Sequence, residues 1–135
     1  MLFRTRIVSS LEKVLCRRDL DADAIPGIRV LRGAVGSFQI AVQAECNVRL
    51  RCQWKSPLQD HVRVREVGLV PCCQPADLED PYVLVHEPGY YPDPLLELSG
   101  QSLRISKGHW HSLWVTVGIP PEWKPGAYEI VFDLS

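Results

Sequence analysis

The sequence predicts an all-β fold, an antiparallel β-sandwich of about eight or nine short strands, immunoglobulin-like or jelly-roll-like, with at most one short helix. Apolar and polar residues alternate over 37–55, 113–119 and 128–134, which is the pattern of strands with one face on a core. Eleven prolines and nine glycines divide the chain into short segments joined by turns. A length of 135 residues is enough for one domain with one core, over residues 1–135.

The N-terminal part is expected to contain a strand, a short helical segment and a loop. Residues 2–8 have the composition of a strand. The residues from Ser9 to Glu12 have capping-box spacing, which predicts one or two helical turns over 9–15. The polar stretch over 17–27 ends in Pro-Gly and is expected to be a loop.

Two long alternating strands are expected next, over 37–46 and 48–54, with a turn between them. The even-numbered apolar residues of both strands are predicted to face the core, and the odd-numbered residues to face solvent. Cys46 and Cys52 are on the core phase, so we interpret them as small buried hydrophobic residues. The chain has five cysteines, an odd number that argues against a complete disulfide framework and favours a reducing compartment.

The rest of the chain is expected to contain five shorter strands. They cover 62–69, 82–85, 102–105, 113–119 and 128–134. A slip in the alternation near Glu66 predicts a β-bulge. The proline-rich stretches over 71–81, 88–95 and 120–126 are expected to be loops or turns, because proline cannot donate to a strand ladder.

Charge and motifs exclude several classes of function. The net charge of −1 provides no field for steering to nucleic acid or anionic lipid, so neither is expected as a partner. No secretory signal precedes the first strand, and no apolar run approaches the roughly 20 residues of a membrane span. The protein is therefore expected to be cytoplasmic if Met1 is its natural start. No nucleotide-binding, zinc-protease or serine-hydrolase motif occurs, and no cofactor is expected.

Three groups of polar residues are candidates for a metal, redox or anion-binding site. His109 and His111 would share one face of a strand, but a zinc site needs three or four ligands, so we interpret them as surface or turn residues and expect no metal. Cys72 and Cys73 are adjacent and lack Cys-x-x-Cys geometry. A basic stripe on the polar phase of the strands, which we interpret as a solvated or docking face, comprises Arg49, Arg51, Lys55, Arg63 and Arg65.

Carboxylates also gather near the aromatic segment at 88–95. Glu87, Asp93 and Glu97 could supply the pair that glycoside hydrolysis needs. The preferred interpretation is that Asp93 caps backbone N–H groups in a proline-rich turn and that the two glutamates are solvated.

Aromatic residues gather toward the C-terminal end, at Tyr90, Tyr91, Trp110, Trp114 and Trp123. Trp114 is out of phase with the core residues of its strand and is expected to face away from the core. Exposed aromatic side chains anchor interfaces or stack on sugar rings, so Trp114 is a candidate for either role.

Three segments then resemble a known family: Pro88–Leu95 (Pro-Gly-Tyr-Tyr-Pro-Asp-Pro-Leu), Ser112–Val117 (Ser-Leu-Trp-Val-Thr-Val) and Lys124–Tyr128 (Lys-Pro-Gly-Ala-Tyr). Their order and wording are similar to the N-terminal β-sandwich domain of glycoside hydrolase family 123 and its uncharacterised relatives. Ser10–Val14 and Gly36–Ile40 resemble the opening and an early strand of that domain, so the resemblance spans nearly the whole chain. The chain departs from the family at Gly33-Ala34-Val35-Gly36, where relatives tend to have a Gly-Glu-Arg-like lead.

The resemblance implies a division of labour. Relatives place a (β/α) barrel after this sandwich, and that barrel carries an Asp-Glu pair that hydrolyses N-acetylhexosaminides. A barrel needs roughly 250 residues, so the catalytic pair is not expected in this chain. We therefore expect a non-catalytic accessory domain, the N-terminal part of a longer protein, that packs against a C-terminal barrel.

The expected docking or site-edge residues are Tyr90, Tyr91, Asp93 and Trp114, with Trp110 as a further candidate. One alternative is a stand-alone carbohydrate-binding module in which Trp114, Trp110 and Tyr91 stack on sugars. The other alternative is a protein-interaction sandwich with no role in sugar binding.

Overall fold

The computed structural model describes residues 2–73 and 79–135 and confirms the all-β prediction. Those residues form eight strands and two 3-10 turns, Gln59–His61 and Ser99–Gln101. The strands are β1 (Phe3–Ser9), β2 (Val35–Ala44), β3 (Val48–Lys55), β4 (Val62–Cys72), β5 (Gly89–Glu97), β6 (Ser102–Ile105), β7 (Trp110–Gly118) and β8 (Val131–Leu134). None of the described helices is long and apolar enough to cross a membrane.

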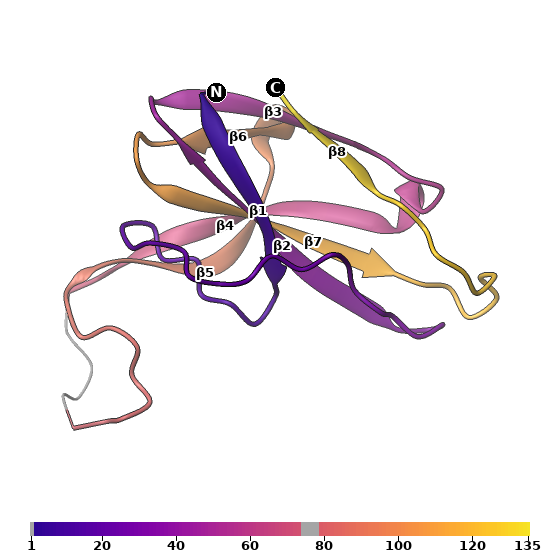
Figure 1. Ribbon diagram of the computed structural model, residues 1–135, viewed down its shortest axis with the longest axis horizontal. Coiled ribbons are helices and arrows are strands. Elements are labelled where there is room, and N and C mark those ends of the chain that lie inside the picture. Colours follow the sequence, from indigo (N-terminus) through magenta and orange to yellow (C-terminus); the bar gives the residue numbers. More distant parts are fainter. Residues whose placement is uncertain (1, 74–78) are drawn as a thin grey trace.

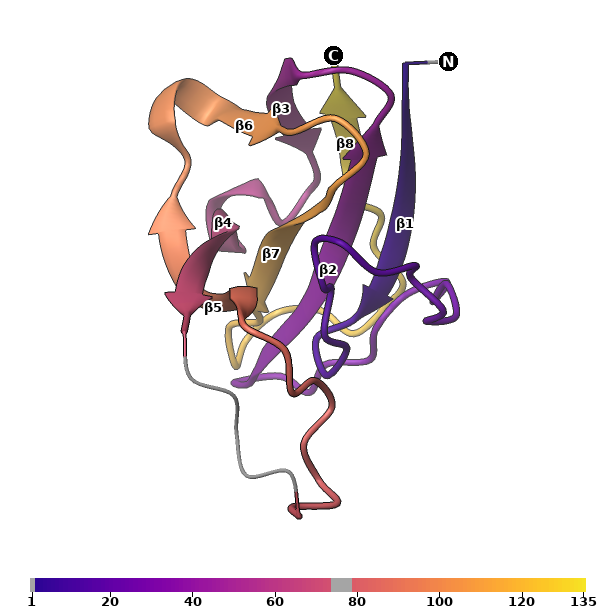
Figure 2. The same ribbon diagram turned by 90° about the vertical axis from the view of Figure 1, so that its left-hand side faces the viewer.

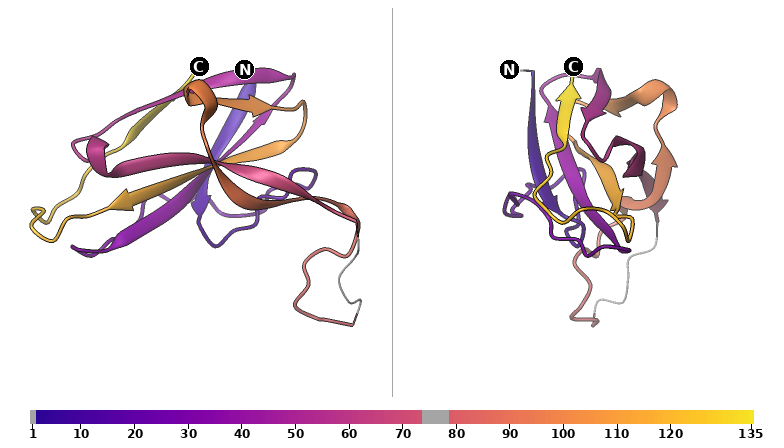
Figure 3. Two further views of the ribbon diagram at one scale, coloured as in Figure 1. Left: turned by 180° about the vertical axis from the view of Figure 1, so that it is seen from behind. Right: turned by 90° about the vertical axis from the view of Figure 1, so that its right-hand side faces the viewer.

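The strands form two antiparallel sheets. The larger has the order β1-β2-β7-β4-β5 and the smaller β6-β3-β8. In Figure 1 the strands of the larger sheet fan out around a common centre, and β3, β6 and β8 lie along one side of them. Figures 2 and 3 show that β1 begins and β8 ends at the same end of the sandwich, while residues 79–88 extend away from the opposite end.

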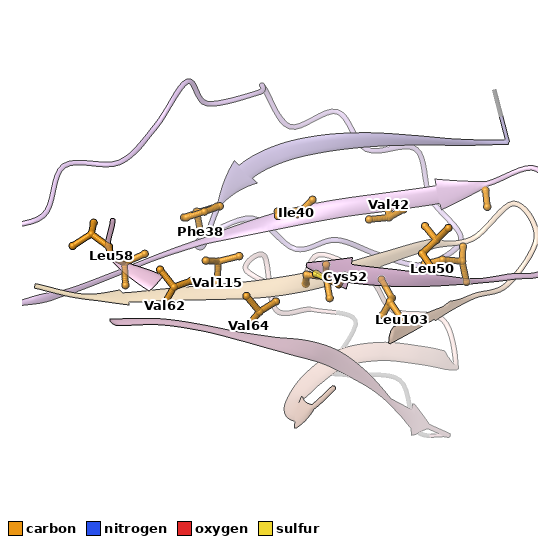
Figure 4. Close-up of a cluster of buried hydrophobic side chains, with 14 residues drawn as sticks. Phe38, Ile40, Val42, Leu50, Cys52, Leu58, Val62, Val64, Leu103 and Val115 are labelled. Carbon is orange, nitrogen blue, oxygen red and sulfur yellow. The ribbon is translucent and has the colours of Figure 1, made fainter. Parts of the chain in front are cut away.

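The main core fills the space between the two sheets, as the alternation predicts (Figure 4). Cys52 and Leu103 from the smaller sheet and Leu113 and Val115 from β7 are fully buried. Cys52 is 0% exposed, which confirms its interpretation as a core residue, and this burial raises the pKa of its thiol to about 11. Cys46 lies in the turn after β2 and is only partly buried, so the prediction for this second cysteine was wrong.

A second, smaller core lies on the outer face of the larger sheet, beneath residues 10–25. We call this segment the strap, and in Figure 2 it crosses β2 and β1. Val14 from the strap packs against Val8, Ala41 and Trp110. The outer phase of β2 was expected to face solvent, but the strap buries Gln39 and Ala41 to 3% and 0% exposure, so that expectation was wrong here.

The strap is not helical, contrary to the capping-box prediction. Ser9 accepts from the backbone of its neighbours instead: its Oγ takes the N–H of Leu11 at 3.2 Å and its carbonyl takes that of Glu12 at 3.2 Å. These bonds form a turn, and contacts with the sheet then hold the strap extended. A sequence that favours only one helical turn does not form a stable helix, and hydrogen bonds to the sheet decide its conformation instead.

The segment over 88–95 is a strand, β5, rather than the predicted loop. It is an edge strand that pairs only with β4, and an edge position tolerates proline because one side of the strand needs no donors. Residues 82–85, predicted as a strand, form part of the connection instead. β4 runs to Cys72, into the predicted 71–81 loop, of which residues 74–78 are outside the described part. β8 begins at Val131, three residues later than predicted.

The bulge predicted near Glu66 occurs two residues later, at Gly68. Val67 faces Leu95 and Leu69 faces Pro92, so two β5 residues stand opposite the single residue Gly68.

Candidate functional site

The outer face of the larger sheet is covered on one half and open on the other. The strap covers β1, β2 and the start of β7 and reaches the start of β5 through the Cys16–Tyr90 hydrogen bond, whereas Trp114 on β7 and Arg65 on β4 stay partly exposed. Gln39, Trp114 and Arg65 lie in one row across β2, β7 and β4. Gln39 is buried while Trp114 and Arg65 are partly exposed, so the boundary of the covered area runs between Gln39 and Trp114.

A hollow of about 230 Å³ lies at this boundary, and we call it the Trp114 hollow. Its lining residues are Ser10, Glu12, Lys13 and Val14 from the strap, Pro92, Asp93 and Leu95 from β5, and Gln39, Val67 and Trp114 from the sheet between them. The hollow therefore combines an indole ring with an ammonium group and two carboxylates. These groups come from four segments that are distant in the sequence.

The bulge of β5 brings Asp93 to the hollow. Asp93 and Pro94 together oppose Gly68, so β5 departs from regular pairing at these two residues. A Cβ atom on residue 68 would lie 2.9 Å from Pro94 Cγ and 2.8 Å from Leu96 Cδ1. A side chain at residue 68 would therefore displace Pro94 and Leu96, which belong to the strand that forms this wall of the hollow.

Gln39 fixes the opposite wall. Its Nε2 donates to the carbonyls of Ser9 at 3.1 Å and Glu12 at 2.9 Å, and its Oε1 accepts from the Ser112 hydroxyl at 2.9 Å. Both N–H donors and the carbonyl oxygen of this buried amide thus have partners. Because two of the partners belong to the turn that begins the strap, the network holds Glu12 and Lys13 over the sheet.

Tyr90 and Tyr91 line a second hollow of about 270 Å³, between the start of β5 and the strap. Arg18 pairs with Glu87 at 2.9 Å, and the Cys16 thiol donates to the Tyr90 carbonyl with a sulfur–oxygen distance of 3.7 Å. The Tyr91 hydroxyl donates to the Glu87 carbonyl. The strap and β5 are therefore joined, while the Tyr90 side chain remains 55% exposed.

Trp110 is placed differently from the other four candidates. It is 3% exposed, in the core beneath the strap, with the Arg4 guanidinium carbon 4.9 Å from the centre of its ring. It has no free ring face to offer a ligand. Trp110 and Trp114 have the same phase on β7, and only the strap, which covers one and not the other, distinguishes them.

The described residues contain no group of three or more His, Cys, Asp or Glu side chains placed to hold a metal ion. His111 accepts a hydrogen bond from the Ser106 N–H at its Nε2, at 3.1 Å, and this requires the neutral ring. Burial lowers the pKa of His111, and the neighbouring His109 lowers it further. His111 is thus a satisfied structural histidine.

The three carboxylates that could supply a hydrolytic pair have different surroundings. Glu87 pairs with Arg18 and Glu97 pairs with Arg63 at exposed positions. Asp93 lines the Trp114 hollow. Glu87 and Glu97 are therefore surface groups engaged with arginines, whereas Asp93 lies in strand β5 and not in the turn in which it was expected to cap backbone N–H groups.

Sequence reasoning missed a third concave surface, at the open side of the sandwich. A cleft of about 400 Å³ lies between the two sheets, and its lining includes Ile7, Ile28, Phe38, Tyr128 and Phe132. No local pattern indicates it, because its residues come from distant parts of the chain and include loop positions.

No protein-family model and no curated protein matches this chain. Among solved structures, a family 123 glycoside hydrolase from Clostridium perfringens, analysed for glycolipid glycan hydrolysis, is similar in fold, with a TM-score of 0.74 and 15% identity. The match covers 100% of this chain and 24% of that chain, so this chain spans about a quarter of the hydrolase's length. The two share a β-sandwich fold.

Proposed function

We propose that this chain is a non-catalytic accessory β-sandwich of a larger glycoside hydrolase-like protein, packing against a catalytic barrel. The observation that carries the proposal is that the fold match covers all of this chain but only 24% of a longer glycoside hydrolase. The resemblance of the Tyr-Tyr-Pro-Asp-Pro segment and the Trp114 strand supports the same assignment. The pairing of Glu87 and Glu97 with arginines also supports it, because hydrolysis needs a pair of available carboxylates.

The docking role falls to β5 and its neighbourhood. Pro92 and Pro94 have no N–H to donate, so β5 resists extension by another strand and offers side chains instead. Tyr90 is 55% exposed, and Tyr82 and Leu84 on the preceding connection are 90% and 70% exposed. Exposed aromatic and aliphatic side chains of this kind suit an interdomain interface, typically about 600–1,500 Å². Tyr91, Asp93 and Trp114 would then lie along the edge of that contact.

The first test is an activity assay on the purified 135-residue chain with aryl N-acetylhexosaminides. We expect no turnover, because the catalytic pair is assigned to the barrel. Turnover that survives repurification and is lost in Asp93→Asn would contradict the proposal. Sequencing the gene beyond Ser135 is the companion test, since a stop codon there would leave no barrel to dock.

The second test addresses docking in the full-length protein. Tyr90→Ala is expected to separate the unfolding of the sandwich from that of the barrel in calorimetry, because it removes an interface anchor. Tyr128→Ala is the matched control: Tyr128 is also an exposed tyrosine, 38% exposed, but it lies beside the open cleft. Equal effects of both substitutions would argue against a docking role specific to β5.

A further inference from the structure

We propose that the Trp114 hollow is a binding site for a single uncharged sugar ring. The proposal goes beyond the accessory role, which requires only docking, and it does not depend on a barrel. All of the groups that it uses belong to this chain.

The lining of the hollow combines an aromatic ring with hydrogen-bonding groups, as a sugar ring requires. Trp114 is partly exposed, so its indole can take the apolar C–H face of a pyranose. Asp93 and Lys13 are exposed at the rim, where a carboxylate can accept from ring hydroxyls and an ammonium can donate to them. An aromatic floor with polar groups of both kinds at the rim matches a polyhydroxylated ring.

The charged groups around the hollow favour a neutral ligand. The lining has two carboxylates, Glu12 and Asp93, and one ammonium, Lys13. Arg65 lies directly across from Trp114 on β4, so two negative and two positive groups surround the indole and no net positive charge attracts phosphates, nucleotides or acidic sugars. Neutral hydroxyls can accept from the positive groups and donate to the negative ones. An uncharged sugar is therefore preferred over an anionic ligand.

The volume of the hollow limits the size of the ligand. The hollow of about 230 Å³ is smaller than the roughly 300–1,000 Å³ of sites for drug-sized ligands. It suits one ring rather than a chain. A ligand of that size with an aromatic contact and a few hydrogen bonds is expected to bind with a dissociation constant on the order of millimolar.

The two walls of the hollow are held in place before a ligand binds. Gln39 holds the turn that begins the strap through two hydrogen bonds, to the Ser9 and Glu12 carbonyls, and the bulge opposite Gly68 sets the β5 wall. Both walls are thus set by interactions behind the lining. A ligand would then have little ordering to impose, which favours binding by a shallow site.

The test is an NMR titration of the ¹⁵N-labelled chain with the methyl glycosides of glucose, galactose, N-acetylglucosamine and N-acetylgalactosamine. The indole N–H resonance of Trp114 is identified by its absence in Trp114→Phe. At least one glycoside is expected to shift this resonance saturably and to leave the indole of the buried Trp110 unchanged. Glycerol at matched hydroxyl concentration is the control for a solvent effect and is expected to give no saturation.

Variants locate the site without unfolding the chain, since Lys13 and Asp93 are both exposed. Lys13→Gln and Asp93→Asn are each expected to weaken binding about fivefold, because the amide that replaces each charge still forms a hydrogen bond, but a weaker one. Asp133→Asn, an exposed aspartate on β8 outside the hollow, is the matched control and is expected to leave affinity unchanged.

Absence of a saturable shift with all four glycosides would overturn the proposal, as would full affinity in the Lys13→Gln/Asp93→Asn double variant. Neither result bears on the accessory assignment, which depends on activity and on the downstream reading frame. A folded spectrum of each variant establishes that a loss of binding is local.

Discussion

The buried amide of Gln39 is expected to stabilise the strap, and with it the whole domain. Gln39→Leu keeps the size of the side chain but removes all three of its hydrogen bonds. The Glu12 carbonyl and the Ser112 hydroxyl would then lose this partner beneath the strap, and the Ser9 carbonyl would keep only its bond from the Glu12 N–H. Leucine adds apolar burial, but it cannot pair with these groups.

The magnitude follows from the number of bonds. Each buried hydrogen bond contributes about 1 kcal/mol net, so losing three is expected to lower the free energy of unfolding by about 3 kcal/mol. That is a large fraction of the roughly 5–15 kcal/mol of a typical domain. For a chain of this length it corresponds to a fall in melting temperature of about 10 °C.

Urea unfolding followed by circular dichroism measures the free energy of unfolding, and limited trypsin digestion reports on the strap. Lys13, Arg17 and Arg18 are exposed trypsin sites on the strap, and their cleavage is expected to accelerate when the strap is released.

Gln43→Leu is the matched control for Gln39→Leu. Gln43 lies on the same face of β2 and accepts from Arg4 at 2.8 Å and donates to the Gly108 carbonyl at 2.7 Å, but both bonds are exposed. Water can replace them, so the cost is expected to stay below about 1 kcal/mol. If Gln39→Leu costs no more than Gln43→Leu, the reasoning that burial makes this network important is refuted.

Three further predictions test other parts of the structure. Gly68→Ala is expected to cost about 1–3 kcal/mol by overpacking β5, whereas Gly118→Ala, where a Cβ meets nothing within 4 Å, is expected to be neutral or stabilising; equal urea midpoints would contradict this. Burial lowers the pKa of His111, so the neutral ring contributes fully to the free energy of unfolding above pH 6.5, the ordinary pKa of histidine, and this contribution is lost as the pH falls below 6.5. His111→Gln is expected to reduce that loss of stability, as measured by thermal melts at pH values above and below 6.5. Iodoacetamide is expected to label exposed Cys73 in the native protein and to label Cys52, with its pKa of about 11, only after unfolding, as followed by mass spectrometry; rapid native labelling of Cys52 would show that the core opens.

Most of the fold class could be predicted from the alternation, because the two faces of a strand differ in what covers them. Leu113, Val115 and Val117 are buried between the sheets, and Trp114 between them points outward, as predicted. The β5 segment was wrongly predicted as a loop. Its prolines disfavour a strand inside a sheet, but an edge strand tolerates them. The pairing partner that makes it an edge strand is β4, and that pairing is not a local property.

The candidate site was predictable only in part. Tyr90, Tyr91, Asp93 and Trp114 could be singled out by residue type and phase, and the fold places the two tyrosines at one hollow and Asp93 and Trp114 at another. Lys13 and Glu12 could not, because their segment carried a helical signal and no sign that it would cross a sheet.

The sequence by itself determined that the chain is all-β, which residues fill the core between the sheets, and that Trp114 faces outward. These features depend on a period of two, which every strand displays locally. Only the tertiary structure decided that the strap buries Trp110 and leaves Trp114 open, and that a bulge opposite Gly68 carries Asp93 to the same hollow. The physical reason is that both outcomes depend on contacts between distant segments, namely the Gln39 network and the close approach of β5 to β4.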